Sequence, residues 1–363
     1  MFRSMTTHEI SDGVWGVGGY LPKDMMGPIA SNAYVIESNK GLVVYDPSCG
    51  DRVAKEIAAL IDRRGSLENL WVVIGHSHFD HAANLHVADL GTVAKRHIIA
   101  HEAGFVGDTI ANSAEQNYRY AIGKMKASHD PYRAAFGATR AMQAPFAFTQ
   151  TVAPALTESV FLSLATLRAG HPTTSNVMPR RLTDSDAQPI DLDGVVARGW
   201  SVDGLTLLAT PGHSTCSISL FDPQKRVLCT SDADWIGNPI FACGSLHACV
   251  ESLETMLALV RTRQVEFLLP GHGLHIVGAD AILCHLQSRA ELLRTLRHEV
   301  LNGWRQHGGE PDVAILTRWL VERSPLFRLW SHAAFPKHMV LPFNMVSTVL
   351  TEEGLLQRRD QLP

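Results

Sequence analysis

Short apolar runs separated by polar turns recur along most of the chain, and this pattern predicts buried strands. Other stretches repeat apolar residues every three or four positions, which predicts amphipathic helices. In residues 51–63, for example, Val53, Ile57, Leu60 and Ile61 fall on one face of a helix. Strands are expected at 32–36, 42–45, 70–74, 97–100, 197–209 (a hairpin), 226–230 and 265–269, and helices at 51–63, 251–262 and 280–305.

The alternation of strands and helices stops after about residue 104 and returns near residue 190. Residues 105–190 are richer in Ala, Met, Tyr and Phe and have a helix-like pattern, so we interpret them as a helical insertion. Residues 306–363 read as short helices and form an expected C-terminal helical appendage. The rest of residues 1–305 is predicted to form one α/β domain.

Composition narrows the classes of protein that the chain can belong to. The 363 residues are 45% hydrophobic, which is enough for one large core. A net charge of -4 gives no general attraction to nucleic acid or to an anionic membrane, so neither is expected as a partner. There is no long apolar run and no apolar signal-peptide region, and the six cysteines form no CxxC pair. We expect a cytoplasmic protein that acts on a small molecule, and a homodimer is left open.

Candidate metal ligands follow the predicted strands. The run Leu70-Trp71-Val72-Val73-Ile74 leads directly into the sequence Gly-His-Ser-His-Phe-Asp-His at 75–81. Four other strands are each followed within a few residues by a His or an Asp. Strand ends at one edge of a sheet are where a rigid scaffold presents reactive groups. The residues at the five strand ends are Asp46, His76, His78, Asp80, His81, His213, Asp232 and His272.

Imidazole and carboxylate groups in this number indicate a metal centre. They are the ligands that zinc takes in proteins, and iron and manganese also accept them. A carboxylate can bridge two cations, and two such ions acidify a bound water and polarise a carbonyl or phosphoryl oxygen. A lone HxH or PGH would be weak support, but their joint occurrence behind strands is hard to explain as core packing.

The combination of HxHxDH, a PGHS-type His, a single Asp behind a strand and a PGHG-type His resembles the metallo-β-lactamase-fold superfamily. The resemblance implies an α/β fold, a four-layer αββα sandwich, here with the helical insertion and a small helical or winged-helix-like C-terminal region. The separation of His81 and His213 exceeds that of the compact members, which locates the insertion. The resemblance covers about residues 8–104 and 190–280 and the helix that follows.

The resemblance also implies a ligand set. It puts His76, His78 and His213 on one metal ion and Asp80, His81 and His272 on a second ion. Asp232 would bridge the two, and Asp46 would orient other ligands. Two divalent ions are expected, zinc in the first place, with iron or manganese as alternatives. Asp80 and Asp232 are the candidate catalytic residues, because the first can carry a proton and the second holds both ions.

The lactonase and glyoxalase II-like branch fits best. We expect hydrolysis of an ester or lactone of a small, fairly apolar substrate by a metal-bridging hydroxide. The alternatives are a thioester hydrolase of glyoxalase II type and a mononuclear iron sulfur-dioxygenase. The acyl-homoserine lactonases have a Tyr three residues after the bridging Asp, where this chain has Trp, so that substrate is in doubt. The candidate substrate contacts are Trp235, Tyr20, Met25, Met26, Tyr118, Phe146 and Phe148.

Overall fold

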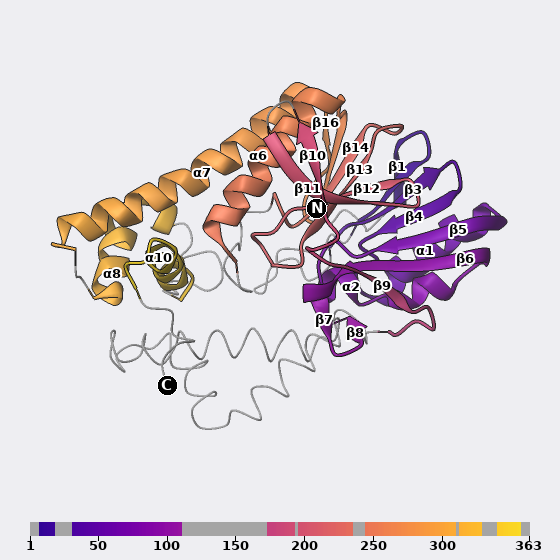
Figure 1. Cartoon of the computed structure of the whole chain (residues 1–363), viewed down its shortest axis with the longest axis horizontal. Helices are drawn as coiled ribbons and strands as arrows, with labels where there is room; N and C mark the ends of the chain where they lie inside the picture. Colours follow the sequence, from indigo (N-terminus) through magenta and orange to yellow (C-terminus); the bar gives the residue numbers. More distant parts are fainter. Residues whose placement is uncertain are drawn as a thin grey trace, which may run out of the picture.

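Two seven-stranded sheets form the centre of the protein in the computed structural model (Figure 1). The first sheet has the order β1-β2-β3-β4-β5-β6-β9, and the second has the order β10-β11-β12-β13-β14-β15-β16. The structure describes residues 7–18, 31–110, 173–192, 195–234, 244–309, 312–328 and 340–356.

The first sheet begins with antiparallel strands and continues with parallel ones. Strands β3 and β4 form the hairpin that the sequence predicts, and β4, β5, β6 and β9 then run parallel to one another. Helix α1 coincides with the helix predicted at 51–63. The elements are β1 (Thr7–Ser11), β2 (Val14–Val17), β3 (Ala33–Ser38), β4 (Gly41–Tyr45), α1 (Asp51–Arg63), β5 (Ser66–Val73), α2 (Phe79–Ala82), β6 (Thr92–His101) and β9 (Pro179–Leu182), with a separate small hairpin of β7 (Phe105–Val106) and β8 (Thr109–Ile110).

The second sheet is antiparallel except at one pair of strands. Strands β14 and β15 are parallel because helix α6 connects them. Strands β11 and β12 form the hairpin predicted at 197–209, with its turn at Asp203-Gly204. The elements are β10 (Gln188–Leu192), β11 (Val195–Val202), β12 (Leu205–Ala209), β13 (Ile218–Asp222), β14 (Val227–Ser231), α6 (Leu246–Arg263), β15 (Phe267–Pro270), β16 (Ile276–Val277) and α7 (Ala279–Gln306).

Alternate residues of each central strand face opposite layers of the fold. In β4, Val43 and Tyr45 lie in the cluster between the two sheets, whereas Val44 packs with Ile57 and Ile61 of α1. The second sheet repeats the arrangement, since its outer face carries α6 and α7 (Figure 1). The predicted four-layer αββα sandwich is therefore confirmed, with helices outside and two sheets inside.

Two segments add to this sandwich. Strand β9 lies within the predicted helical insertion and β10 begins in it, so the described residues 173–190 contain strands where helices are expected. Strand β9 extends the first sheet and β10 the second, while residues 111–172 lie outside the described part of the chain. After α7, helices α8 (Val313–Arg323) and α10 (Val340–Glu352) share one hydrophobic cluster with α6 and α7. Residues 312–328 and 340–356 contain no strand, so the wing of a winged helix is not seen there. The domain boundary at residue 305 stays a prediction.

The last turn of α10 reaches the start of α6. The Glu352 carboxylate accepts a hydrogen bond of 2.9 Å from the backbone N–H of Leu246, the first residue of α6. Glu353 pairs with Arg297 of α7 at 2.6 Å. A carboxylate at a helix N-terminus satisfies a backbone donor and interacts favourably with the helix dipole. Helix α10 is thus held to α6 and α7 by polar contacts as well as by packing.

Candidate metal centre

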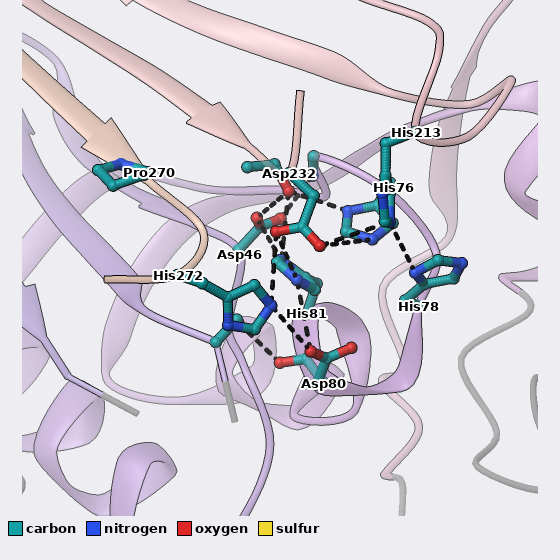
Figure 2. A network of polar contacts seen from close by, with 12 residues as sticks. Asp46, His76, His78, Asp80, His81, His213, Asp232, Pro270 and His272 are labelled. Atoms are coloured by element: carbon teal, nitrogen blue, oxygen red, sulfur yellow. Dashed lines mark hydrogen bonds and ion pairs between the residues drawn. The ribbon is translucent and has the colours of Figure 1, made fainter. Parts of the chain in front are cut away.

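The predicted ligands meet at one edge of the sandwich, where strands from both sheets end (Figure 2). His76 and His78 lie between β5 and α2, and α2 itself carries Asp80 and His81. The second sheet supplies the rest through the segments that follow β12, β14 and β15. Those residues are His213, Asp232 and His272.

The side chains form two groups that match the two predicted ligand sets. His76, His78 and His213 make one group, and Asp80, His81 and His272 make the other. Within each group the candidate ligand atoms all lie within 4.8 Å of one another. These buried clusters of His and Asp are consistent with a dinuclear metal site.

Asp232 lies between the two groups and turns one oxygen towards each. Its Oδ1 is 3.4 Å from His81 Nε2 and 3.5 Å from His272 Nε2. Its Oδ2 is 3.4 Å from His213 Nε2 and 3.9 Å from His76 Nε2. This is the arrangement that a carboxylate bridging two cations requires.

Three buried atoms of the cluster fit a metal ion better than any protein partner. For His76 Nε2, His81 Nε2 and Asp232 Oδ1, no hydrogen bond is found to any residue that the structure describes. An unsatisfied buried polar atom costs about 1–3 kcal/mol, so three together in one place need an explanation. All three are atoms through which imidazole and carboxylate bind divalent cations, and the donor set therefore fits two such ions.

The histidines of the first group are suited to bind a cation because they are neutral. Burial lowers the pKa of His78 to about 3 and holds the pKa of His76 well below its usual value. Burial also lowers the pKa of His213, against the opposing effect of Asp232. A neutral imidazole keeps the lone pair that a metal ion needs.

The second group has the opposite electrostatics. Burial would lower the pKa of His272, but the carboxylates of Asp232 and Asp80 outweigh burial and raise it to about 9. The same two carboxylates and Asp46 raise the pKa of His81 well above its usual value, again against burial. Burial alone would raise the pKa of Asp232, yet the surrounding histidines, His272 foremost, hold it well below the usual value. In the metal-free protein, the protonated histidines and the carboxylates of this group therefore stabilise one another. A bound cation would stabilise the carboxylates in place of the protonated histidines.

Asp46 holds its place through three hydrogen bonds. Its Oδ1 accepts from the backbone N–H of Gly75 at 2.6 Å, and its Oδ2 accepts from His81 Nδ1 at 2.8 Å and Ser231 Oγ at 2.6 Å. Asp46 also forms a close group with His76 and His81. Because both of its oxygens already accept hydrogen bonds, we interpret this group as support for the ligands and not as a third metal site.

Ser231 was missed by the sequence analysis. Its hydroxyl donates to Asp46 and also contacts His76 Nδ1 at 2.9 Å, so it joins two strand ends that are far apart in the sequence. A serine directly before a candidate ligand is the only local signal, and it is too weak to predict this role. The predicted substrate contacts Tyr20, Met25, Met26, Tyr118, Phe146, Phe148 and Trp235 all lie outside the described residues.

Comparison with known proteins agrees with the site and the fold. The profile of the Metallo-beta-lactamase superfamily matches residues 26–272, which is more than half of the chain. The chain therefore belongs to the metallo-beta-lactamase superfamily, and its particular branch is not resolved. A search of curated proteins gives no match. In the described part of the chain, no helix has both the length and the apolar character of a membrane span.

Solved structures share the fold at low sequence identity. A stereoselective inverting sec-alkylsulfatase from Pseudomonas sp. is 15% identical with a TM-score of 0.54; the alignment covers 94% of this chain but only 49% of that one. A metallo-beta-lactamase family protein from Thermus thermophilus is 16% identical with a TM-score of 0.51, with 95% of each chain covered. A beta-lactamase domain protein from Burkholderia ambifaria is 16% identical with a TM-score of 0.52, with 98% and 90% covered. This chain spans about half the length of the sulfatase, and at these identities the similarity concerns the fold alone.

Proposed function

We propose that this protein is a dinuclear metal-dependent hydrolase that cleaves an ester or lactone bond of a small, fairly apolar molecule. The observation that carries the proposal is the position of Asp232, whose two oxygens each face one of two groups of ligands. A mononuclear iron dioxygenase would use only one of these groups, so the number of bound ions distinguishes the two functions. Family membership supports the metal-dependent hydrolase class, and the choice of ester or lactone remains our proposal.

The residues divide the work of holding two ions. His76, His78 and His213 would hold one, Asp80, His81 and His272 would hold the other, and Asp232 would touch both. When bound, two divalent ions supply an acidified water as nucleophile and an electrophile for the carbonyl oxygen. Such a site needs no Ser, Cys or Lys nucleophile of its own.

Asp80 is the best-placed carboxylate to move a proton. Its side chain is 15% exposed, compared with 3% for Asp232 and 1% for Asp46, so a leaving group can reach it. We propose that Asp80 carries a proton to the leaving alkoxide, whereas Asp232 stays fixed between the two groups. The predicted contacts with the substrate, including Trp235, belong to this proposal as well.

Metal analysis and a substrate panel test the proposal. Two zinc ions per chain support it, and a single iron ion would favour the dioxygenase instead. The panel contains lactones, aryl esters, thioesters and phosphotriesters, with a secondary alkyl sulfate added because the sulfatase shares the fold. In water enriched in heavy oxygen, one label should enter the acid product and none the alcohol. A label in the alcohol, or a covalent acyl-enzyme, would contradict this mechanism.

A further inference from the structure

We propose that Ser231 is a positioning residue that sets the tautomer and the orientation of His76, and that shares the support of His81 with Asp46. The inference rests on the proposed dinuclear site, and it concerns a residue that holds no metal itself. Histidine ligands are oriented by the hydrogen bond that their second ring nitrogen makes, so this partner is part of a metal site.

The direction of the hydrogen bonds follows from the chemistry of each group. A carboxylate oxygen can only accept, and Asp46 Oδ2 therefore accepts the proton of Ser231 Oγ at 2.6 Å. With its proton used in this way, Ser231 Oγ accepts at 2.9 Å from His76, which must carry its proton on Nδ1. His81 likewise donates from Nδ1 to Asp46 Oδ2 at 2.8 Å. His76 then presents an Nε2 without a proton to the cluster, and His81 does so in the metal-bound state.

These two Nε2 atoms are buried, and neither has a hydrogen bond to a residue that the structure describes. The tautomer that Ser231 and Asp46 select is thus the one that leaves a lone pair where a cation is expected. His76 belongs to one group of ligands and His81 to the other. The Ser231 hydroxyl therefore contacts His76 of the first group directly, and it contacts Asp46, which orients His81 of the second group.

The backbone is shaped to keep this hydroxyl in place. Ser231 has a φ of 50°, in the left-handed region that non-glycine residues rarely adopt. A Cβ added at Gly75 would lie 2.6 Å from Ser231 Cβ and 2.7 Å from its Oγ. Position 75 must therefore lack a side chain for the serine to fit. The residue before the HxHxDH segment thus packs directly against the residue before Asp232.

The two histidines depend on Ser231 to different degrees. His81 Nδ1 has Asp46 as its nearer acceptor at 2.8 Å, with Ser231 at 3.2 Å. For His76 Nδ1, Ser231 is the one hydrogen-bond partner within the described ranges. Loss of the hydroxyl should therefore release His76 and leave His81 oriented. The result is an asymmetric loss of metal affinity, in the group of His76, His78 and His213.

A purely structural role for Ser231 makes a different prediction. If the hydroxyl only stabilised the end of β14, its loss would lower the stability of the fold without favouring one ion over the other. Ser48 is a matched control because it is also buried, has a φ of 59°, and donates its hydroxyl to the backbone oxygen of Ser31 at 2.7 Å. Among the residues that the structure describes, its hydroxyl makes no hydrogen bond to a candidate ligand.

The test is a zinc titration of the metal-free full-length chain against a chelator, for wild type, Ser231→Ala, Ser231→Gly and Ser48→Ala. Glycine removes the hydroxyl but relieves the positive φ, so it separates the hydrogen bond from backbone strain. We expect both Ser231 variants to bind one zinc ion about 10–100-fold more weakly and the other within about threefold, with Ser48→Ala like wild type. Histidine-selective ¹⁵N spectra of the metal-free protein should show one ring leaving the Nδ1–H tautomer.

The outcomes separate this inference from the proposed function. If wild type binds fewer than two zinc ions, the dinuclear assignment fails. If wild type binds two and both Ser231 variants bind both ions as tightly as Ser48→Ala, the positioning role is refuted and the dinuclear site stands. Equal weakening of both ions would also refute the asymmetry on which the role depends.

Discussion

Zinc binding to the metal-free protein at pH 7 should release about two protons per chain from histidine rings, both on one side of the cluster, in addition to the proton of a metal-bound water that ionises. The protons come from His81 and His272, because nearby carboxylates raise both pKa values and an imidazolium cannot bind a metal ion. His76 and His78 are neutral at this pH, so each can bind an ion through its unprotonated ring nitrogen without releasing a proton. The two ions should therefore differ in the pH dependence of their affinity.

The size of the effect follows from the pKa of His272, which is raised to about 9. A pH of 7 is two units below this pKa, so removing the proton from His272 costs about 3 kcal/mol, which lowers the apparent affinity for zinc roughly a hundredfold. The affinity falls as the pH falls, by about tenfold per pH unit for each proton released. With two protons the slope is about two for this ion, and it is near zero for the ion bound by His76, His78 and His213.

Calorimetric titration in buffers of different ionisation enthalpy measures the proton count directly. Wild type should release about two histidine protons at pH 7, besides the proton of an ionised metal-bound water, and the histidine contribution should fall as the pH approaches 9 and above. His272→Gln should reduce the count by about one, because the amide carries no titrating proton. Release of no protons, or equal release for the two ions, would refute the electrostatic reasoning.

Three further predictions concern single side chains. Asp232→Asn should lower kcat roughly a thousandfold or more, because the amide replaces one of the two carboxylate oxygens that face the ligand groups. Cys216→Ala should keep kcat within about tenfold of wild type, or about 1.4 kcal/mol of barrier. Equal losses in the two variants would favour a thiol nucleophile. Gly271→Ala should bring the metal content below two ions per chain, because the new Cβ would lie 2.5 Å from Asp232 Oδ1. Gly18→Ala is the control, because the nearest atom to its new Cβ would be 4.0 Å away and the metal content should not change. Two ions per chain in Gly271→Ala, measured by elemental analysis, would contradict this reasoning. A maleimide should modify exposed Cys284 before buried Cys216 by peptide mass spectrometry, and the reverse order would contradict their burial.

The pattern of the sequence predicts most of the central layers because burial repeats locally. Helix α1 and the β3–β4 hairpin agree with prediction since each buries one apolar face or an apolar run. Strands β1 and β9 were not predicted. Strand β1 has no fully buried residue, and β9, Pro179–Leu182, has only Leu182 buried. Such strands exist through pairing with a neighbour that is distant in sequence, which local periodicity does not record.

In the candidate site too, some residues can be predicted from local sequence and others only from the folded structure. His76, Asp232 and the other predicted ligands are recognisable because their chemistry is unusual behind apolar runs. The role of Ser231 depends instead on a positive φ and on its distance to Asp46 and His76, and those are properties of the folded chain. The electrostatic difference between the two groups also arises only in three dimensions, because the carboxylates of Asp80 and Asp232 lie 3.3 Å and 3.5 Å from His272 Nε2 and raise its pKa, whereas burial lowers the pKa of His78.

The ligands are divided between the two sheets in a regular way. In each group, two side chains come from the segment after β5 and one comes from the second sheet, as His76, His78 and His213 illustrate. Each bound ion would thus be a cross-link between the halves of the sandwich, comparable in topology to a disulfide. Because a ligand of the folded state alone stabilises it by about 4 kcal/mol at a thousandfold excess over Kd, metal supply would govern how readily the halves separate. Separately expressed halves, cut outside the ligand segments, should then reassociate more tightly with the metal than without it.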